Sequence, residues 1–141
     1  MKEPFWLKKE MLLAIHGGLL ARFGDMPGIR DEGMQESALN RPREVCHYSD
    51  DTTLAALAAA YTAGLAKNHP FLDGNKRIGF MADYTFIGVN GTQLTVQEEE
   101  AVLLIRGLAA GEIEEAAYAR WLEDGSNSSQ PKQRGIPPGR K

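Results

Sequence analysis

The segment from Ile78 to Val89 constrains the fold more than any other part of the chain, because it is apolar on nearly every helical face. Apolar residues stand at positions 78, 80, 81, 82, 84, 86, 87 and 89. At a helical pitch these positions leave no broad polar stripe, so the segment predicts a helix that other elements bury on most sides. With 141 residues, the chain is long enough for one such core, and we expect a single domain.

Helical patterns also mark five other segments, whose expected ends are set by capping residues, glycine and proline. They are residues 8–23, 31–40, 51–67, 95–110 and 112–123. Gly24 and Gly111 should stop the first and the fourth of them. Pro42 should end the second, and Asp51 and Thr52 should cap the third. Thr95 and Glu98 have the spacing of a capping box at the start of the fourth. We therefore expect an all-α fold, a compact domain of about six helices around the buried central helix. Residues 24–33 should be irregular, with at most a short hairpin.

The polar stretch just before the buried helix contains the residues that point to chemistry. Residues 69–77 read His-Pro-Phe-Leu-Asp-Gly-Asn-Lys-Arg. His69 is a potential proton acceptor, and Asp73 is a potential ligand for a divalent metal ion. Gly74 lets backbone and ligand approach closely, and free N–H groups at a helix start attract anions. The stretch thus holds the groups needed to move a phosphate-containing group onto a hydroxyl.

The bland alternative is an ordinary helix start whose Lys76 and Arg77 are merely solvated. Taken singly, each residue favours that alternative, whereas the whole set in this order favours an anion site. No Gly-x4-Gly-Lys-(Ser/Thr) sequence occurs anywhere in the chain. A Walker-type phosphate loop is therefore excluded.

Composition excludes several other classes of protein. The net charge of −3 gives no electrostatic reason to expect binding to nucleic acid. The single cysteine, Cys46, excludes an internal disulfide framework and a multi-cysteine metal cluster. No apolar run is long enough to cross a membrane, and the start of the chain lacks the apolar core of a signal peptide. We therefore expect a cytoplasmic protein without membrane contact.

The stretch 69–77 resembles the signature of the Fic/Doc superfamily, H-x-F-x-(D/E)-G-N-G-R-x-x-R. Lys76 stands where the adenylyltransferases of that superfamily have a second glycine, and Phe80 stands where they have a second arginine. The Asn-Lys-Arg form resembles the Doc branch, the toxins of toxin–antitoxin pairs. The likeness extends over roughly residues 8–124 through further segments: 22–24, 27–33, 36–39, 41–42 and 121–122.

Carried over position by position, the resemblance implies roles for the matching residues. His69 would take the proton from the target hydroxyl, Asp73 would hold Mg²⁺, and Phe71 would pack inward and keep the loop in shape. The phosphates of the nucleotide would lie in a cradle formed by Gly74, Asn75, Lys76 and Arg77. The irregular segment before the second helix would dock the target or an antitoxin, through Pro27, Gly28, Ile29, Arg30 and Asp31.

The resemblance to the Doc branch implies an ATP-dependent protein kinase. Lys76 fills space that nucleotide phosphates use in the adenylyltransferases, so the nucleotide would bind reversed and present its γ-phosphoryl group. The implied target is a threonine of elongation factor Tu, and the implied outcome is inhibition of translation. The implied partner is a Phd-like antitoxin whose C-terminal segment is disordered alone. No inhibitory signature, a Ser or Thr followed four residues later by Glu-Gly or Glu-Asn, follows the core.

Two alternatives stay open at this point. Gly74 is retained, which keeps protein adenylylation as a second reaction. A displaced loop within residues 24–33 would instead leave a catalytically silent module that pairs with an antitoxin.

The composition changes from Gly125 onward. Residues 126–141 contain three prolines, two glycines, four cations and no acid. Such a segment cannot supply a core. We expect residues 1–124 to form the helical domain and residues 125–141 to form a disordered basic tail.

Overall fold

The computed structural model describes residues 3–24, 26, 28–49, 51–68 and 74–127. These residues form six helices and no β-strand, apart from an isolated β-bridge at Ile29. The helices are α1 (Lys9–Phe23), α2 (Glu32–Tyr48), α3 (Leu54–Asn68), α4 (Asn75–Val89), α5 (Glu98–Ala109) and α6 (Glu115–Asn127). The expected all-α fold with about six helices is confirmed. None of the described helices is both long enough and apolar enough to span a membrane.

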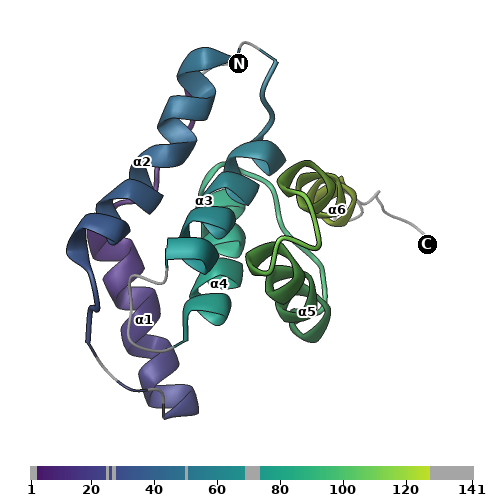
Figure 1. Ribbon diagram of the computed structural model, residues 1–141. Coiled ribbons are helices and arrows are strands. Elements are labelled where there is room, and N and C mark those ends of the chain that lie inside the picture. The colour runs from purple at the N-terminus through teal and green to yellow at the C-terminus, as the bar shows by residue number, and fades with distance from the viewer. Residues whose placement is uncertain (1–2, 25, 27, 50, 69–73, 128–141) are drawn as a thin grey trace.

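Helices α3 and α4 form the centre of the molecule, with α1 and α2 on one side and α5 and α6 on the other (Figure 1). The prediction of a buried central helix is confirmed for α4. Eight of its residues are buried, and they include Ile78, Phe80 and Phe86. Helix α3 is buried even more completely, because its alanine-rich sequence lets neighbouring helices approach from several sides.

Small residues set the spacing on both sides of α3. A Cβ added at Gly64 of α3 would lie 3.1 Å from the Cα and Cβ atoms of Ala38 on α2. A Cβ added at Gly79 of α4 would lie 3.3 Å from Cγ2 of Thr62 on α3. Both glycines therefore occupy close helix crossings at which any larger residue would push the helices apart.

Two predicted helix ends in the first half of the chain are wrong. Pro42 does not end the second helix: α2 runs through it to Tyr48, and Pro42 is buried. Val45 and Cys46, beyond the proline, pack against the core, and this packing outweighs the local cost of about 3 kcal/mol for proline inside a helix. Helix α3 is capped by Thr53, whose Oγ1 accepts from the Ala56 N–H at 3.1 Å, rather than by the two residues before it.

Two further predictions are wrong in the second half of the chain. The capping box at Thr95 does not form, because the Thr95 hydroxyl donates to the carbonyl oxygen of Gly125 at 2.9 Å. Helix α5 begins at Glu98 and ends before Gly111, whose φ of 81° confirms it as the predicted stop. Helix α6 begins at Glu115, three residues later than expected, because the N–H groups of residues 112 and 113 both donate to the carbonyl of Gly107.

Helix α6 also ends later than expected, at Asn127 rather than at residue 123. Its last turn packs beneath the segment before α5: an added Cβ at Gly125 would overlap Cγ1 of Val96. Ser126 is buried, and its hydroxyl donates to the carbonyl of Leu122 at 2.9 Å. Tertiary packing therefore extends the helix beyond Gly125, where the composition of the chain changes. Residues 128–141 of the expected tail lie outside the described residues.

The segment before α1 is bound to the central pair of helices. The backbone N–H of Leu7 donates to the Tyr61 hydroxyl on α3 at 3.0 Å. At the end of α4, the Asn90 side chain accepts from the backbone N–H of Phe5 at 2.8 Å and donates to its carbonyl at 3.0 Å. Together these three bonds hold the N-terminal segment across α3 and α4.

A buried polar cluster connects α3, α4 and α6. The Tyr118 hydroxyl donates to Oδ2 of Asp83 at 2.6 Å, and Thr62 Oγ1 is hydrogen-bonded to Asp83 Oδ1. Thr62 Oγ1 also lies 3.1 Å from the Gly79 carbonyl oxygen and 3.2 Å from that of Ala58. Burial raises the pKa of Asp83 well above its ordinary value. A protonated Asp83 that donates to Thr62, which donates to Gly79 in turn, satisfies the cluster with the hydrogens available.

We expect Asp83→Asn to remove a pH dependence from the stability of the protein. Because the pKa of Asp83 is raised in the folded state, its contribution is full below the ordinary aspartate pKa. It is lost as the pH rises toward the raised value. The free energy of unfolding of the unmodified protein should fall by up to about 1.4 kcal/mol per pH unit in that range. Asparagine has no such titration, so the variant should gain stability relative to the unmodified protein as the pH rises.

Urea unfolding at several pH values measures this difference. Asp83→Ala is the control: it removes the partner of the buried Tyr118 hydroxyl and should cost about 1–3 kcal/mol. Equal pH slopes for the unmodified protein and Asp83→Asn would contradict a buried protonated carboxyl group.

Candidate phosphate-binding site

The predicted anion site lies at the start of α4, and the structure describes its second half, residues 74–77. Gly74 precedes the helix with φ at 79°, in the left-handed region that favours glycine. Its carbonyl oxygen accepts from the N–H of Ile78 at 2.9 Å, which begins the helical hydrogen bonding. Asn75, the first residue of α4, is buried, whereas Lys76 and Arg77 are partly exposed. The predicted roles of His69, Phe71 and Asp73 fall on residues outside the described part.

A hollow of about 190 Å³ opens at this helix start, and we call it the phosphate hollow. Its lining residues are Gly74, Asn75, Lys76, Arg77, Val102 and Arg106. The four predicted cradle residues therefore line one hollow. Of the described residues in this lining, none is acidic and three carry a positive charge. A helix start that combines N–H donors, the positive end of the helix dipole and several cations suits a phosphate group.

Arg77 also borders a second hollow of about 490 Å³ on the side of α1. Its guanidinium carbon lies 4.2 Å from the centre of the Phe23 ring, and that of Arg22 lies 4.9 Å from the same ring. These cation–π contacts hold Arg77 beside the end of α1. Glu98 and Glu99 line this second hollow too, so its charge is mixed, unlike that of the phosphate hollow.

The predicted docking segment is bonded to the residue that precedes the motif. The Arg30 guanidinium donates to the carbonyl oxygen of Asn68, the last residue of α3, at 2.7 Å. The Asn68 side chain donates to the carbonyl of Met34 at 3.1 Å. Asp31 has a structural role, because its Oδ1 accepts from the N–H of Met34 at 3.1 Å and caps α2. Gly28 has φ at 117°, and Pro27 lies outside the described residues.

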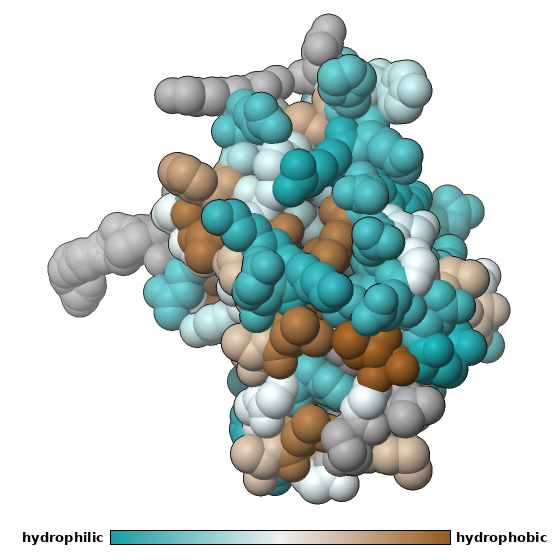
Figure 2. Space-filling view, turned by 90° about the vertical axis from the view of Figure 1, so that its left-hand side faces the viewer, coloured by the Kyte–Doolittle hydropathy of each residue, from teal (hydrophilic) through white to brown (hydrophobic). Residues whose placement is uncertain are grey.

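The docking segment and its neighbours also expose apolar surface. Phe23, Met26 and Met34 are 39%, 60% and 42% exposed. Figure 2 shows the side of the molecule formed by α1 and α2, which is largely hydrophilic but gathers hydrophobic side chains over its lower part. Apolar side chains beside a charged hollow suit the binding of a protein segment.

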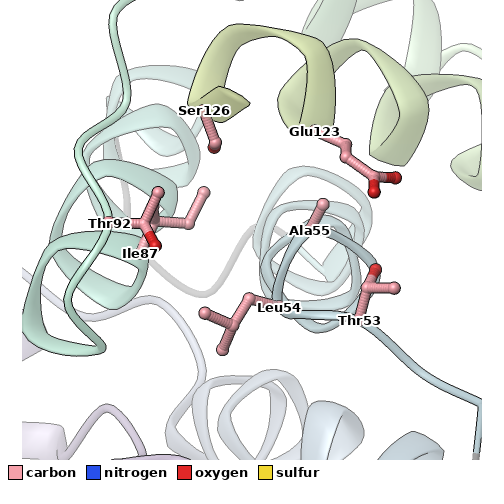
Figure 3. Close-up of a pocket in the computed structure, with 7 residues that line it drawn as sticks. All are labelled: Thr53, Leu54, Ala55, Ile87, Thr92, Glu123 and Ser126. Atoms are coloured by element: carbon pink, nitrogen blue, oxygen red, sulfur yellow. The ribbon is translucent and has the colours of Figure 1, made fainter. Parts of the chain in front are cut away.

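Another hollow of about 190 Å³ lies between the start of α3 and the ends of α4 and α6 (Figure 3). Ile87 lines it, twelve residues along α4 from Asn75, which corresponds to about 18 Å of helix. The only charged residue in its lining is Glu123, and the Ser126 hydroxyl there already donates within α6. This hollow therefore lacks the cations that an anion would need.

Two further observations concern histidine and metal ligands. His16 on α1 is buried, which agrees with the structural role that its place among helical apolar residues favours. The described residues contain no group of three or more His, Cys, Asp or Glu that could hold a metal ion. A magnesium ion bound by one carboxylate, phosphate oxygens and water does not need such a group.

Sequence reasoning missed Arg106 as a residue of this site. Arg106 follows the capping signals of α5 by eight residues, and nothing in its local sequence relates it to residues 74–77. Only the packing of α5 against α4 brings them together. Its spacing of four residues from Val102 is the one available signal, because it places both residues on the same helix face.

Comparison of the sequence with known proteins finds one family and two relatives that match this chain. The sequence model of the Fic/DOC family matches residues 6–87. A protein from Escherichia phage P1 named protein kinase doc is 33% identical over 116 residues, which cover 82% of this chain and 91% of the phage protein. A protein from Mycolicibacterium smegmatis named toxin Doc is 40% identical over 73 residues, which cover 51% of this chain and 56% of that toxin.

We expect Phe80→Arg to destabilise the protein strongly rather than to add a phosphate-binding group. Phe80 is only 6% exposed and belongs to the hydrophobic core, so the variant would bury an unpaired guanidinium group. The loss in the free energy of unfolding should be about 3 kcal/mol or more. Thermal or urea unfolding measures it.

Tyr84→Arg is the matched control, because Tyr84 lies on the same helix and is 45% exposed. This variant should change the free energy of unfolding by only about 0.5 kcal/mol. A Phe80→Arg protein as stable as Tyr84→Arg would show that position 80 can accept the second arginine after all.

Proposed function

This chain belongs to the Fic/Doc family, in its Doc branch, and we propose that it is a Doc-like toxin that transfers the γ-phosphate of ATP to a protein hydroxyl. The observation that carries this proposal is the phosphate hollow, where three cations of the described residues, Lys76, Arg77 and Arg106, gather at the start of α4. The name of the phage P1 relative, protein kinase doc, supports the reaction, and the name of the mycobacterial relative supports the toxin activity.

Lys76 supports phosphoryl transfer over nucleotidyl transfer. It stands where the adenylylating relatives have glycine, and its side chain lines the phosphate hollow. A lysine occupies volume there and adds a point charge. We propose that this places the terminal phosphate, rather than the α-phosphate, next to the acceptor. Protein adenylylation is the second candidate, because Gly74 is retained; the burial of Phe80 weighs against it, since no second arginine can occupy that position.

Two residues of the motif would accept the proton of the target hydroxyl and hold the metal ion. We propose that His69 accepts the proton of the target hydroxyl, for which a neutral imidazole with a pKa near the working pH is suited. We propose that Asp73 holds Mg²⁺, which neutralises charge on the phosphate oxygens when it is bound. The cationic residues of the phosphate hollow would bind and orient the same phosphates.

The proposed target and the proposed partner rest on the resemblance to the Doc branch. We propose a threonine of elongation factor Tu as the acceptor and inhibition of translation as the result. We propose a Phd-like antitoxin as the partner, with a disordered C-terminal segment that folds on binding. The exposed apolar side chains of Phe23, Met26 and Met34, beside the segment bonded to Asn68, offer a surface for such a segment.

Incubation of the protein with elongation factor Tu and ATP, labelled in separate reactions at the α- and the γ-phosphate, tests the reaction. We expect γ-label on the acceptor and a mass increase of about 80 Da, against about 329 Da for adenylylation. His69→Ala should lower the rate by two to four orders of magnitude and should no longer slow growth when expressed, because the general base is lost.

Each other outcome points to a different function. Transfer of α-label would put adenylylation first, and transfer of neither label by folded protein would favour a silent module that binds an antitoxin. Unchanged transfer by His69→Ala would remove His69 from the mechanism.

We expect Lys76→Gly to weaken γ-phosphoryl transfer by about 10- to 100-fold, because a charged contact to phosphate is lost. The rate of γ-label transfer at saturating and at limiting ATP measures the effect. Lys9→Gly makes the same change in the first turn of α1 and should leave transfer unchanged. If Lys76→Gly transfers γ-label at the unmodified rate, Lys76 does not orient the nucleotide.

A further inference from the structure

We propose that Arg106 of α5 is a phosphate-binding residue of this site and supplies the second guanidinium group that position 80 cannot provide. The proposal rests on the proposed function, since it assigns a further residue to the same nucleotide site. Among the described residues that line the phosphate hollow, Arg106 is the only charged one from outside the first turn of α4.

The packing of α5 places Arg106 at this hollow. Ala101, Ile105 and Leu108 are buried and hold α5 against the core. A Cβ added at Gly79, one turn beyond Asn75 on α4, would lie 3.9 Å from Cδ1 of Ile105. The residue after Ile105 is therefore held near the first turn of α4 by a close contact between the two helices.

Val102 and Arg106 both line the hollow and are four residues apart on α5. Residues at this spacing lie on the same helix face, one turn apart. This face of α5 thus forms the wall opposite the backbone donors of α4, with an apolar group beside a cationic one. A phosphate bound at the helix start would have α4 on one side and the guanidinium group of Arg106 on the other.

The charges around Arg106 favour an anion between the two helices. Arg106 is exposed and forms no ion pair or side-chain hydrogen bond with any of the described residues. Lys76 and Arg77 line the same hollow, and no acidic residue of the described part of the chain does. Three like charges around one small hollow repel one another, and a phosphate group relieves that repulsion. Arg77 is also in contact with the Phe23 ring, on the side of the second hollow.

An arginine suits this position better than a lysine would. Its planar guanidinium group can donate two parallel hydrogen bonds to two phosphate oxygens, whereas an ammonium group acts as a point charge. Phe80, at the position of the second arginine in the adenylylating relatives, is buried in the core and has no polar group. Arg106 provides the missing group from a different helix.

Isothermal titration with Mg²⁺ and a non-hydrolysable ATP analogue, and separately with inorganic tripolyphosphate, tests the proposal. Arg106→Gln should weaken binding of both probes by about 10- to 100-fold, as expected for loss of a charged hydrogen-bonding group. Arg106→Lys should retain part of the affinity, because it keeps the charge but not the bidentate geometry. Arg120→Gln, at an exposed position on α6, is the matched control and should bind both probes as the unmodified protein does.

The KM for ATP in γ-label transfer should rise for Arg106→Gln in parallel with the dissociation constant. If the unmodified protein transfers γ-label and Arg106→Gln has the same KM and the same affinities, the role of Arg106 is overturned while the proposed function stands. If the unmodified protein transfers no label, the proposed function fails and the titrations alone decide. Weaker binding by Arg106→Gln would then support the role of Arg106, and equal or absent binding of both probes would overturn it.

Discussion

Thr62 on α3 fixes the position of the site-bearing helix α4 through contacts with two of its residues. Its methyl group would lie 3.3 Å from a Cβ at Gly79, and its hydroxyl is hydrogen-bonded to Asp83 one turn further on. Tyr118 of α6 closes the same cluster from the far side. Because these groups are buried and mutually satisfied, α4 cannot shift along α3 without leaving polar atoms unpaired. The first turn of α4 therefore keeps a fixed position beside α5.

Local sequence was sufficient for the features that depend on near neighbours. The apolar pattern of residues 78–89 predicted a buried helix, and Gly24 and Gly111 predicted two helix ends, because both adopt left-handed φ values of 70° and 81°. Local sequence was insufficient where packing between distant segments decides the structure. Pro42 is kept inside α2 by contacts of the following turn with the core, and the Thr95 hydroxyl is taken by Gly125, thirty residues away.

The residues of the candidate site divide in the same way, into those that local sequence could predict and those that it could not. Residues 74–77 are consecutive, so the chain itself brings the cradle together, and a helix start gives their N–H groups a common direction. Arg106 belongs to another helix and joins them only through the packing of α5 against α4. The docking segment was inferred from the resemblance, and the sequence alone could not show that Arg30 reaches the carbonyl of Asn68. Such a bond depends on the packing of α2 along α3.

The bonds that hold the N-terminal segment set an order for folding during synthesis. Phe5 is paired with Asn90, 85 residues later, and Leu7 with Tyr61, 54 residues later. Phe5 and Leu7 therefore leave the ribosome well before the residues to which they bond. The cluster around Asp83 requires Tyr118 as well. A nascent chain thus cannot complete the core that positions α4 until Tyr118 has left the ribosome, so α4 takes its final position only after this residue of α6 has been made.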